Sequence, residues 1–419
     1  MRTSAKRISA KRISAANDRA DRLPLEWRSV LSRMPGSKRR LLILSEIIAP
    51  YRIPVFNALA RCREIDLHVV FLAETDATLR QWPVYKDEIR FSHEVLPSWR
   101  LRLGGKNVLL NWRLGISLKR FAPETIICGG YNYPASWQAL LWARRNHAEF
   151  VLWSESNQHD ARSGSGLVEW MKSYFLERCD RYVAAGASSF AYLQLLGLPE
   201  EKILTAPSVV DNDWFEAHCS AAREREDEIR RRLRLPNRFV LFAGRLVEEK
   251  GVFDLLQAYG RLEHNTQCKV SLVFAGEGSS RAELEQRAKR ITPGTVCFLG
   301  FAQREELAAI YGLADVLVLP THSDPWGLVV NEAMACGLPV IVSSIAGCAA
   351  DLVEEGWNGF VVPPADPDEL CRAIDHVLRD DELRQQMGRR SLERIRKYSP
   401  EACAAGLSAA AFPGRGSVE

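Results

Sequence analysis

Two carboxylates stand eight residues apart in an otherwise apolar stretch near the C-terminus. Residues 321–344 read THSDPWGLVVNEAMACGLPVIVSS, with a helix predicted to start near Asp324 or Trp326 and to stop at Gly337. A carboxylate inside a helix that is apolar nearly all round must face a polar ligand, pair with a cation or take a raised pKa. Glu332 is such a carboxylate, whereas Asp324 before a proline could simply be an N-cap.

Two cations follow another predicted strand, in the segment FVLFAGRLVEEKG at residues 239–251. The strand runs through Gly244 to Arg245 and Lys250. Parallel α/β folds bind ligands at the carboxyl ends of their strands, and Arg can hold a diphosphate with two parallel hydrogen bonds. Taken alone, both cations could equally be solvated surface side chains.

The start of the helix that carries Glu332 adds a third group suited to anions. Free N–H groups at Gly327 and Leu328 would meet the positive end of the helix dipole there. The cations and the helix N-terminus suit a diphosphate, and carboxylates suit the hydroxyls of ribose and hexose rings. Together these groups predict a site for a nucleotide-diphosphate sugar.

The surrounding elements predict two α/β domains. Continuous apolar strands alternate with helices over residues 41–212 and again over 238–395, which is typical of parallel βαβ units. A charged connector with one helical segment, 213–237, separates them. A helical segment, 396–419, follows and could return to the N-terminal domain. The expected fold is two doubly wound domains that face a central cleft.

Composition narrows the class of protein. The chain has 419 residues and a net charge of +4, and no apolar stretch is long enough to span a membrane. Residues 1–40 form a basic tail, expected to be disordered, that is either a non-functional extension or a contact for anionic lipid. Ten cysteines without a CxxC pair favour reduced, buried thiols, a cytoplasmic location and no structural metal site.

The second half resembles the retaining GT-B glycosyltransferases of family 4. The resemblance rests on the basic pair in "GR…KG", the acidic pair in "DPWGLVVNEAMACG" and the segments "VFAGEGSSRAELE" and "GWNGFVVPPADPDELCRAI". It covers nearly all of residues 41–400. It implies an enzyme that takes a nucleotide sugar as substrate, needs no metal or other cofactor, and does not bind nucleic acid.

The resemblance also assigns roles to individual residues. Arg245 and Lys250 would hold the diphosphate as it leaves, and Glu332 would bind the ribose. Asp324, where the family usually has Glu, would contact the hydroxyls of the transferred sugar. The other donor-binding positions implied are Gly244, Gly327, Leu328, and the segment near the base with Phe301 and Gln303.

The first half departs from the family pattern. The loop after its first strand, SEIIAPYRIPVFNALA, has no glycine, and Arg52 occupies the space near the cleft. Arg52 is an acceptor-side candidate, although the two prolines around it could equally serve to start a helix. Glu155 and His159 follow a later strand and are also acceptor-side candidates. The spacing of His159 is unlike that of the family.

Tryptophan and arginine are mixed in the loop-rich stretch 80–115, in RQWPVY, PSWRLRLGG and NWRL. These tryptophans could pack in the core, or they could meet lipid headgroups or stack on sugars. The sequence therefore predicts a cytoplasmic glycosyltransferase, with a saccharide or lipid-linked acceptor and a possible role at the membrane in cell-surface polysaccharide biosynthesis. A nucleotide-sugar epimerase and a non-catalytic glycan-binding subunit are the alternatives.

Overall fold

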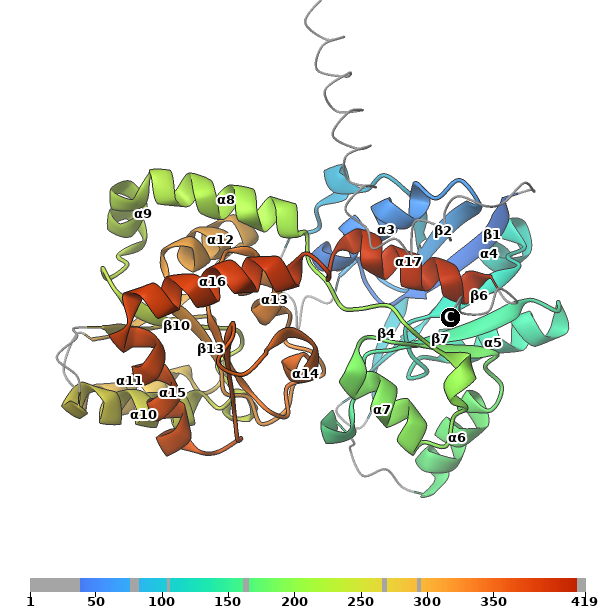
Figure 1. Ribbon diagram of the computed structural model, residues 1–419. Coiled ribbons are helices and arrows are strands. Elements are labelled where there is room, and N and C mark those ends of the chain that lie inside the picture. The colour runs from blue at the N-terminus through green and yellow to red at the C-terminus, as the bar shows by residue number, and fades with distance from the viewer. Residues whose placement is uncertain are drawn as a thin grey trace, which may run out of the picture.

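The structure, a computed structural model, describes residues 38–75, 83–103, 106–160, 166–265, 270–291 and 295–412. Two domains lie side by side, each built on a parallel β-sheet with helices on both faces (Figure 1). The prediction of two doubly wound α/β domains is therefore confirmed. Of the predicted basic tail, residues 1–37 lie outside the described residues.

The N-terminal sheet has seven parallel strands in the order β3-β2-β1-β6-β7-β8-β9. Its central strands are apolar along most of their length because helices cover both faces. The strands are β1 (Arg39–Ser45), β2 (Ile65–Phe71), β3 (Ser92–Val95), β6 (Thr125–Cys128), β7 (Glu149–Ser154), β8 (Arg181–Ala184) and β9 (Ile203–Thr205). An antiparallel hairpin, β4 (Trp99–Leu103) and β5 (Lys106–Leu110), is inserted after β3.

Helices divide between the two faces of this sheet. One face packs against a layer of helices whose buried side chains share a core with alternate strand residues. That layer consists of α4 (Leu114–Phe121), α5 (Pro134–Arg145), α6 (Gly166–Leu176) and α7 (Ala187–Leu195). The opposite face packs against α3 (Ile53–Ala60) and α17 (Pro400–Ala411), which share a second core.

The C-terminal sheet has six parallel strands in the order β12-β11-β10-β13-β14-β15. They are β10 (Phe239–Ala243), β11 (Ser271–Ala275), β12 (Val296–Gly300), β13 (Val316–Leu319), β14 (Val340–Ser343) and β15 (Gly359–Val362). The helices around it are α10 (Val252–Asn265), α11 (Arg281–Ala288), α12 (Arg304–Leu313), α13 (Leu328–Ala335), α14 (Ala349–Leu352), α15 (Pro367–Arg379) and α16 (Asp381–Ile395).

The C-terminal helices join the two domains. Figure 1 shows α16 over the C-terminal domain and α17 over the N-terminal domain. Between them the chain turns at Ser399, whose hydroxyl accepts a hydrogen bond from the amide of Ala402 and caps α17. The side chain of Asn212 donates to the carbonyls of Ile395 and Tyr398 at 3.0 Å each, and so fixes this turn to the connector.

The connector holds two helices, α8 (Asn212–Glu224) and α9 (Glu226–Leu233), where the sequence predicted one helical segment. Both helices lie with the C-terminal domain (Figure 1). Arg223 of α8 donates to the carbonyl of Gly312 at 3.0 Å and also to that of Cys336. The connector is therefore part of the C-terminal core.

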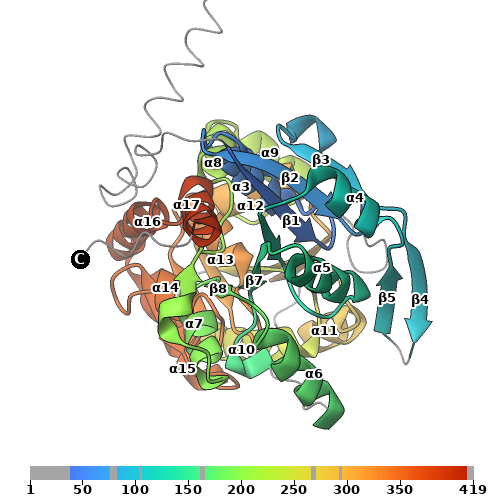
Figure 2. The same ribbon diagram turned by 90° about the vertical axis from the view of Figure 1, so that its right-hand side faces the viewer.

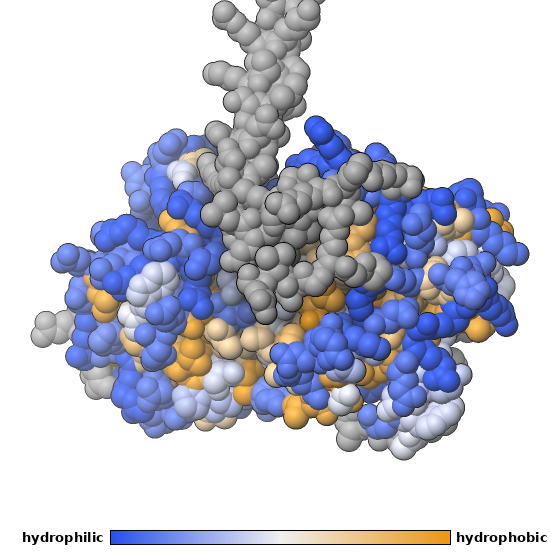
Figure 3. All heavy atoms as spheres, turned by 45° about the vertical axis from the view of Figure 1, so that its right-hand side comes forward, coloured by the Kyte–Doolittle hydropathy of each residue, from blue (hydrophilic) through white to orange (hydrophobic). Residues whose placement is uncertain are grey.

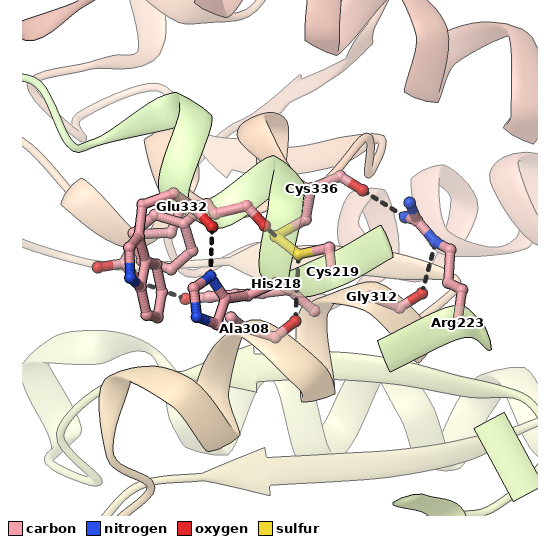
Figure 4. Close-up of a disulfide and its surroundings, with 10 residues drawn as sticks. His218, Cys219, Arg223, Ala308, Gly312, Glu332 and Cys336 are labelled. Carbon is pink, nitrogen blue, oxygen red and sulfur yellow. Dashed lines mark hydrogen bonds between the residues drawn. A yellow bond between two sulfur atoms is a disulfide. The ribbon is translucent and has the colours of Figure 1, made fainter. Parts of the chain in front are cut away.

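A disulfide joins Cys219 of α8 to Cys336 at the end of α13 (Figure 4). The expectation that all cysteines are reduced thiols is therefore wrong for this pair. Sequence analysis did not predict this pairing, because the two cysteines are 117 residues apart in the sequence and no short motif marks them. The seven other cysteines among the described residues are free thiols.

The pairing makes a chemical prediction. When the chain is denatured without reductant, iodoacetamide should label the seven free cysteines of the described residues but leave Cys219 and Cys336 unlabelled. Cys336→Ser should lower the free energy of unfolding by about 2–4 kcal/mol, because the cross-link restricts the unfolded chain. Mass spectrometry and denaturant titration are the measurements, with Cys371→Ser as the free-thiol control. Labelling of Cys219 in the unreduced protein would contradict the pairing.

Candidate active site

The turns that follow β10 and β13 are bound tightly together at the carboxyl edge of the C-terminal sheet. The carbonyl of Glu249 accepts hydrogen bonds from the amide of His322 at 2.8 Å and from the hydroxyl of Thr321 at 3.0 Å. Gly251 has a φ of +67°, and a Cβ there would lie 1.9 Å from the carbonyl oxygen of Pro320. Only glycine allows this approach, so the sequence GR…KG places two βα turns in contact.

Lys250 and Asp324, predicted as catalytic, face one another across this contact. Lys250 Nζ lies 2.7 Å from Asp324 Oδ2 and donates to the carbonyl of Ser323 at 2.9 Å. Both side chains are largely buried, at 13% and 17% exposure. Arg245 is different: its side chain is 59% exposed and pairs with Glu249 at 2.8 Å. Both cations are thus at the same edge, but only Lys250 is enclosed.

The helix that carries Glu332 starts just after the two predicted positions. Its N-cap is Gly327, with a φ of +96°, and α13 begins at Leu328. Asp324 is therefore not the N-cap, although its Oδ1 accepts from the amide of Trp326 at 3.2 Å. The start lies close to Trp326, the later of the two predicted positions, because the chain makes a further turn between Asp324 and Gly327. The first amides of α13 still open at the edge that holds Lys250.

Glu332 lies half-buried on α13 and accepts a hydrogen bond from the hydroxyl of Tyr311 at 2.8 Å. Burial raises the pKa of Glu332 to about 7, and the bond from Tyr311 and the charge of Arg304 only partly offset this effect. A carboxylate with such a pKa is half-protonated near neutrality and gains from partners that favour its charged form. Hydroxyl groups of a ligand would be such partners.

The segment after β12 contributes a residue that the sequence analysis missed. Phe301 is exposed, and Gln303 is the N-cap of α12 with a buried Oε1 that accepts no hydrogen bond from the described residues. The next residue, Arg304, pairs with Glu88 of the N-terminal domain, with Nη1 3.1 Å from Oε2. Its guanidinium also lies 4.2 Å from the ring centres of Tyr85 and Trp214. Sequence gave no signal for Arg304, because its partners are distant in the chain.

The acceptor-side candidates Arg52 and Glu155 form an ion pair at the carboxyl edge of the N-terminal sheet. Arg52 Nη2 lies 2.8 Å from Glu155 Oε1, and the guanidinium sits 4.6 Å from the ring centre of Trp153. Burial alone would lower the pKa of Arg52, but the charges of Glu155 and Tyr51 raise it overall. Nearby, the hydroxyl of Tyr133 donates to Glu46.

The loop with His159 reaches the C-terminal domain through a different side chain. Asn157 is fully buried and donates to the carbonyl of Asp324 at 3.0 Å, while its Oδ1 accepts from the amide of His159 at 2.8 Å. The ring of His159 is exposed and lies near Gln158. The structure therefore brings Asn157 against the loop of Asp324. An asparagine between polar neighbours carries no distinctive sequence signal, which explains why it was missed.

Other contacts hold the two domains together around this loop. A Cβ on Gly186 of the N-terminal domain would lie 2.4 Å from the ring of Trp326, so glycine allows the indole to pack there. Trp326 Nε1 donates to Asn331 Oδ1, which in turn donates through Nδ2 to the carbonyl of Ser208. The carboxylate of Asp351 accepts from the amide of Ala187 at 2.9 Å.

The described residues contain no cluster of three or more His, Cys, Asp or Glu that could hold a metal ion. None of the helices in the same part of the chain is both long enough and apolar enough to cross a membrane.

Two Rossmann-like domains with cations, a helix N-terminus and a carboxylate at the carboxyl edge of the second one define a glycosyltransferase of the GT-B fold. The family model for glycosyl transferases group 1 matches residues 224–394. The glycogen synthase of Mycobacterium tuberculosis is 36% identical over 319 residues, or 74% of this chain and 73% of that protein. The chain belongs to the group 1 glycosyl transferases.

Other relatives match over less of their length. An uncharacterized glycosyltransferase of Methanocaldococcus jannaschii is 31% identical over 216 residues, or 51% of this chain and 54% of that protein. The alpha-D-kanosaminyltransferase of Streptomyces kanamyceticus is 31% identical over 45% of this chain and 48% of that protein. The chain spans about half the length of these two relatives.

Solved structures agree with the fold. The Anabaena protein Alr3699/HepE, in complex with UDP and glucose, has a TM-score of 0.67 at 19% identity and covers 89% of this chain and 98% of its own. The sucrose-phosphate synthase of Thermosynechococcus elongatus has a TM-score of 0.66 at 20% identity. The match covers 89% of this chain and 98% of that protein.

The raised pKa of Glu332 predicts how ligand affinity depends on pH. Ribose hydroxyls would donate to the ionised carboxylate, so binding should lower its pKa and release a proton. Since the free group titrates near pH 7, the affinity for a nucleoside diphosphate should rise about tenfold from about pH 6 to about pH 8. Isothermal titration across this range is the measurement.

Glu332→Gln should remove this pH dependence, because an amide does not titrate. Glu306→Gln, an exposed position on α12, is the matched control and should retain it. A pH dependence that survives in Glu332→Gln would mean that another group is responsible.

Proposed function

We propose that the chain is a retaining glycosyltransferase of family 4, which transfers a hexose from a nucleotide-diphosphate donor to a hydroxyl of a saccharide or lipid-linked saccharide. The observation that carries this proposal is the Lys250–Asp324 pair beside the start of α13, with Glu332 on the same helix. Cell-surface polysaccharide biosynthesis is the setting we infer, since the O-antigen chain mannosyltransferase B of Escherichia coli is 24% identical over 78% of the chain.

The donor diphosphate would take over cations that now have protein partners. Arg245 pairs with Glu249 and Lys250 with Asp324. A diphosphate carries more charge than one carboxylate and can accept from both cations and from the amides of α13. Because these groups are fixed before the reaction, they would stabilise the negative charge that develops on the leaving phosphate. This role needs no metal ion.

The transferred sugar would lie between Asp324 and the N-terminal edge. Asp324 would accept from a sugar hydroxyl once Lys250 turns to phosphate. On the opposite side, Glu46, Glu155 and Arg52 present charged groups that suit the hydroxyls of an acceptor. The donor phosphate would receive the proton of the acceptor hydroxyl. The cross-domain bond from Asn157 would help to exclude water from the closed site.

The proposed function predicts the effect of removing the Lys250 side chain. Lys250→Ala should lower turnover by about 10²–10³, because one preorganised charge contact to the leaving group is lost. Donor consumption with a panel of nucleotide sugars and saccharide acceptors is the measurement. Lys289→Ala, an exposed lysine on the same domain, should keep its activity. Turnover of Lys250→Ala near that of the parent would refute the assignment.

The proposed function also predicts different effects for substitutions of the two carboxylates. Glu332→Gln should weaken binding of a free nucleoside diphosphate. Asp324→Asn should not weaken it, because the change releases Lys250 from its carboxylate partner. Asp324→Asn should instead lower donor turnover at least about tenfold, through loss of a charge-assisted hydrogen bond worth roughly 1.5–3 kcal/mol.

Titration of both variants with the free diphosphate and with the full donor tests this split, with melting temperatures measured in parallel. Equal losses for both ligands in both variants would show that the carboxylates support the helix rather than the substrate. If the panel yields an epimerised donor in place of a free nucleoside diphosphate, the chain is an epimerase.

A further inference from the structure

The outer surface of the N-terminal helix layer exposes many large hydrophobic side chains. Helices α4, α5 and α6 cover the same face of the sheet, so their solvent-facing sides point the same way. The β4–β5 hairpin lies beside α4 and α5 (Figure 2). The rings of Trp137 and Tyr174 stack with their centres 6.2 Å apart and so join α5 to α6.

Large apolar side chains gather on this surface. Trp99 and Trp112, at the base of the hairpin, are 67% and 55% exposed, and their ring centres are 5.3 Å apart. Ile116 on α4 and Leu141 on α5 are exposed as well. Helix α6 adds Val168, Trp170, Met171 and Tyr174.

This concentration is confined to one domain. Among the described residues, Phe301 is the single exposed large hydrophobic side chain of the C-terminal domain. Figure 3 brings the N-terminal side forward and shows hydrophobic residues among hydrophilic ones at its surface. Exposed apolar side chains clustered on one side of a protein indicate an interaction surface.

Basic residues predominate in the segment that forms most of this surface, whereas α6 carries one charged residue of each sign, Glu169 and Lys172. Residues 99–145 contain eight basic residues and one acidic residue, Glu124, which pairs with Arg39 and Arg40 at the far end of α4. The basic residues are Arg100, Arg102, Lys106, Arg113, Lys119, Arg120, Arg144 and Arg145. Arg113, Lys119 and Arg145 are exposed. We call the hairpin and the outer sides of α4–α6 the aromatic–basic face.

We propose that the aromatic–basic face docks on an anionic lipid bilayer. Tryptophan prefers the boundary between headgroups and acyl chains, and arginine or lysine beside it pairs with anionic headgroups. The face offers few acidic side chains to a protein partner of mixed charge, since residues 99–145 contain Glu124 alone and α6 adds Glu169. The excess of positive charge beside exposed tryptophans therefore favours a lipid surface.

The face also ends at the candidate active site. Helix α5 begins at Pro134, directly after Tyr133, whose hydroxyl donates to Glu46 at the acceptor edge. If the proposed function holds, a docked molecule would present its acceptor edge to a lipid-linked saccharide at the bilayer surface. Docking itself does not depend on that function.

Co-sedimentation of the full chain with vesicles tests the proposal without any donor present. Vesicles of about 30% phosphatidylglycerol in phosphatidylcholine should bind the protein, and pure phosphatidylcholine should bind it far less. The variant Trp99→Ser/Trp112→Ser should lower the partition coefficient at least about tenfold. The variant Arg113→Gln/Arg145→Gln should lower it by about fivefold per residue, with a weaker dependence on salt.

A matched variant elsewhere should bind vesicles as the parent does. Arg372→Gln/Arg379→Gln removes two exposed charges on α15 of the C-terminal domain. An unchanged thermal shift with a nucleoside diphosphate shows that each variant is folded. The proposal is overturned if the parent does not bind anionic vesicles, or if the face variants bind as well as the parent does. Lost turnover with retained vesicle binding would count against the proposed function alone.

Discussion

The ion pair between Lys250 and Asp324 is the interaction on which the candidate site depends. Two charged groups that are largely removed from water must compensate one another, since either alone would be costly to bury. The pair forms because β10 and β13 are neighbours in the sheet and Gly251 lets their turns touch. The position of the pair then fixes the turn that leads into α13. The sheet order thus places cation, carboxylate and helix start at one edge.

The same turn is held from the other domain. The carbonyl of Asp324 accepts from Asn157, and the next tryptophan, Trp326, packs on Gly186. Arg304 bridges the domains on the other side, between Glu88 and the ring of Trp214. A ligand that drew Lys250 away from Asp324 would therefore act on a turn that belongs to both domains. In the proposed function, substrate binding would therefore be coupled to the domain arrangement through these contacts.

The two domains differ in how their outer elements are built. Helix α8 is fixed to the C-terminal core by the disulfide and by Arg223. The N-terminal half instead exposes tryptophans around its hairpin and helices, on the surface that we propose docks on lipid. In the proposed function the C-terminal domain would hold the donor, and in the proposed docking the N-terminal domain would meet the lipid surface.

The sequence alone determined the two-domain α/β fold, because apolar strands that alternate with helices leave few other arrangements. It also singled out Glu332 as a carboxylate within an apolar helix, Lys250 as a cation after a strand, and Asp324 by its spacing from Glu332 and the family resemblance. It could not determine the partners of these residues. Asn157, Arg304 and the Cys219–Cys336 bond depend on contacts between residues far apart in the chain. The start of α13 likewise followed from the bonds around Asp324 and not from the N-cap signal of Asp-Pro. Local pattern specifies which groups need partners, and only tertiary packing decides which ones they find.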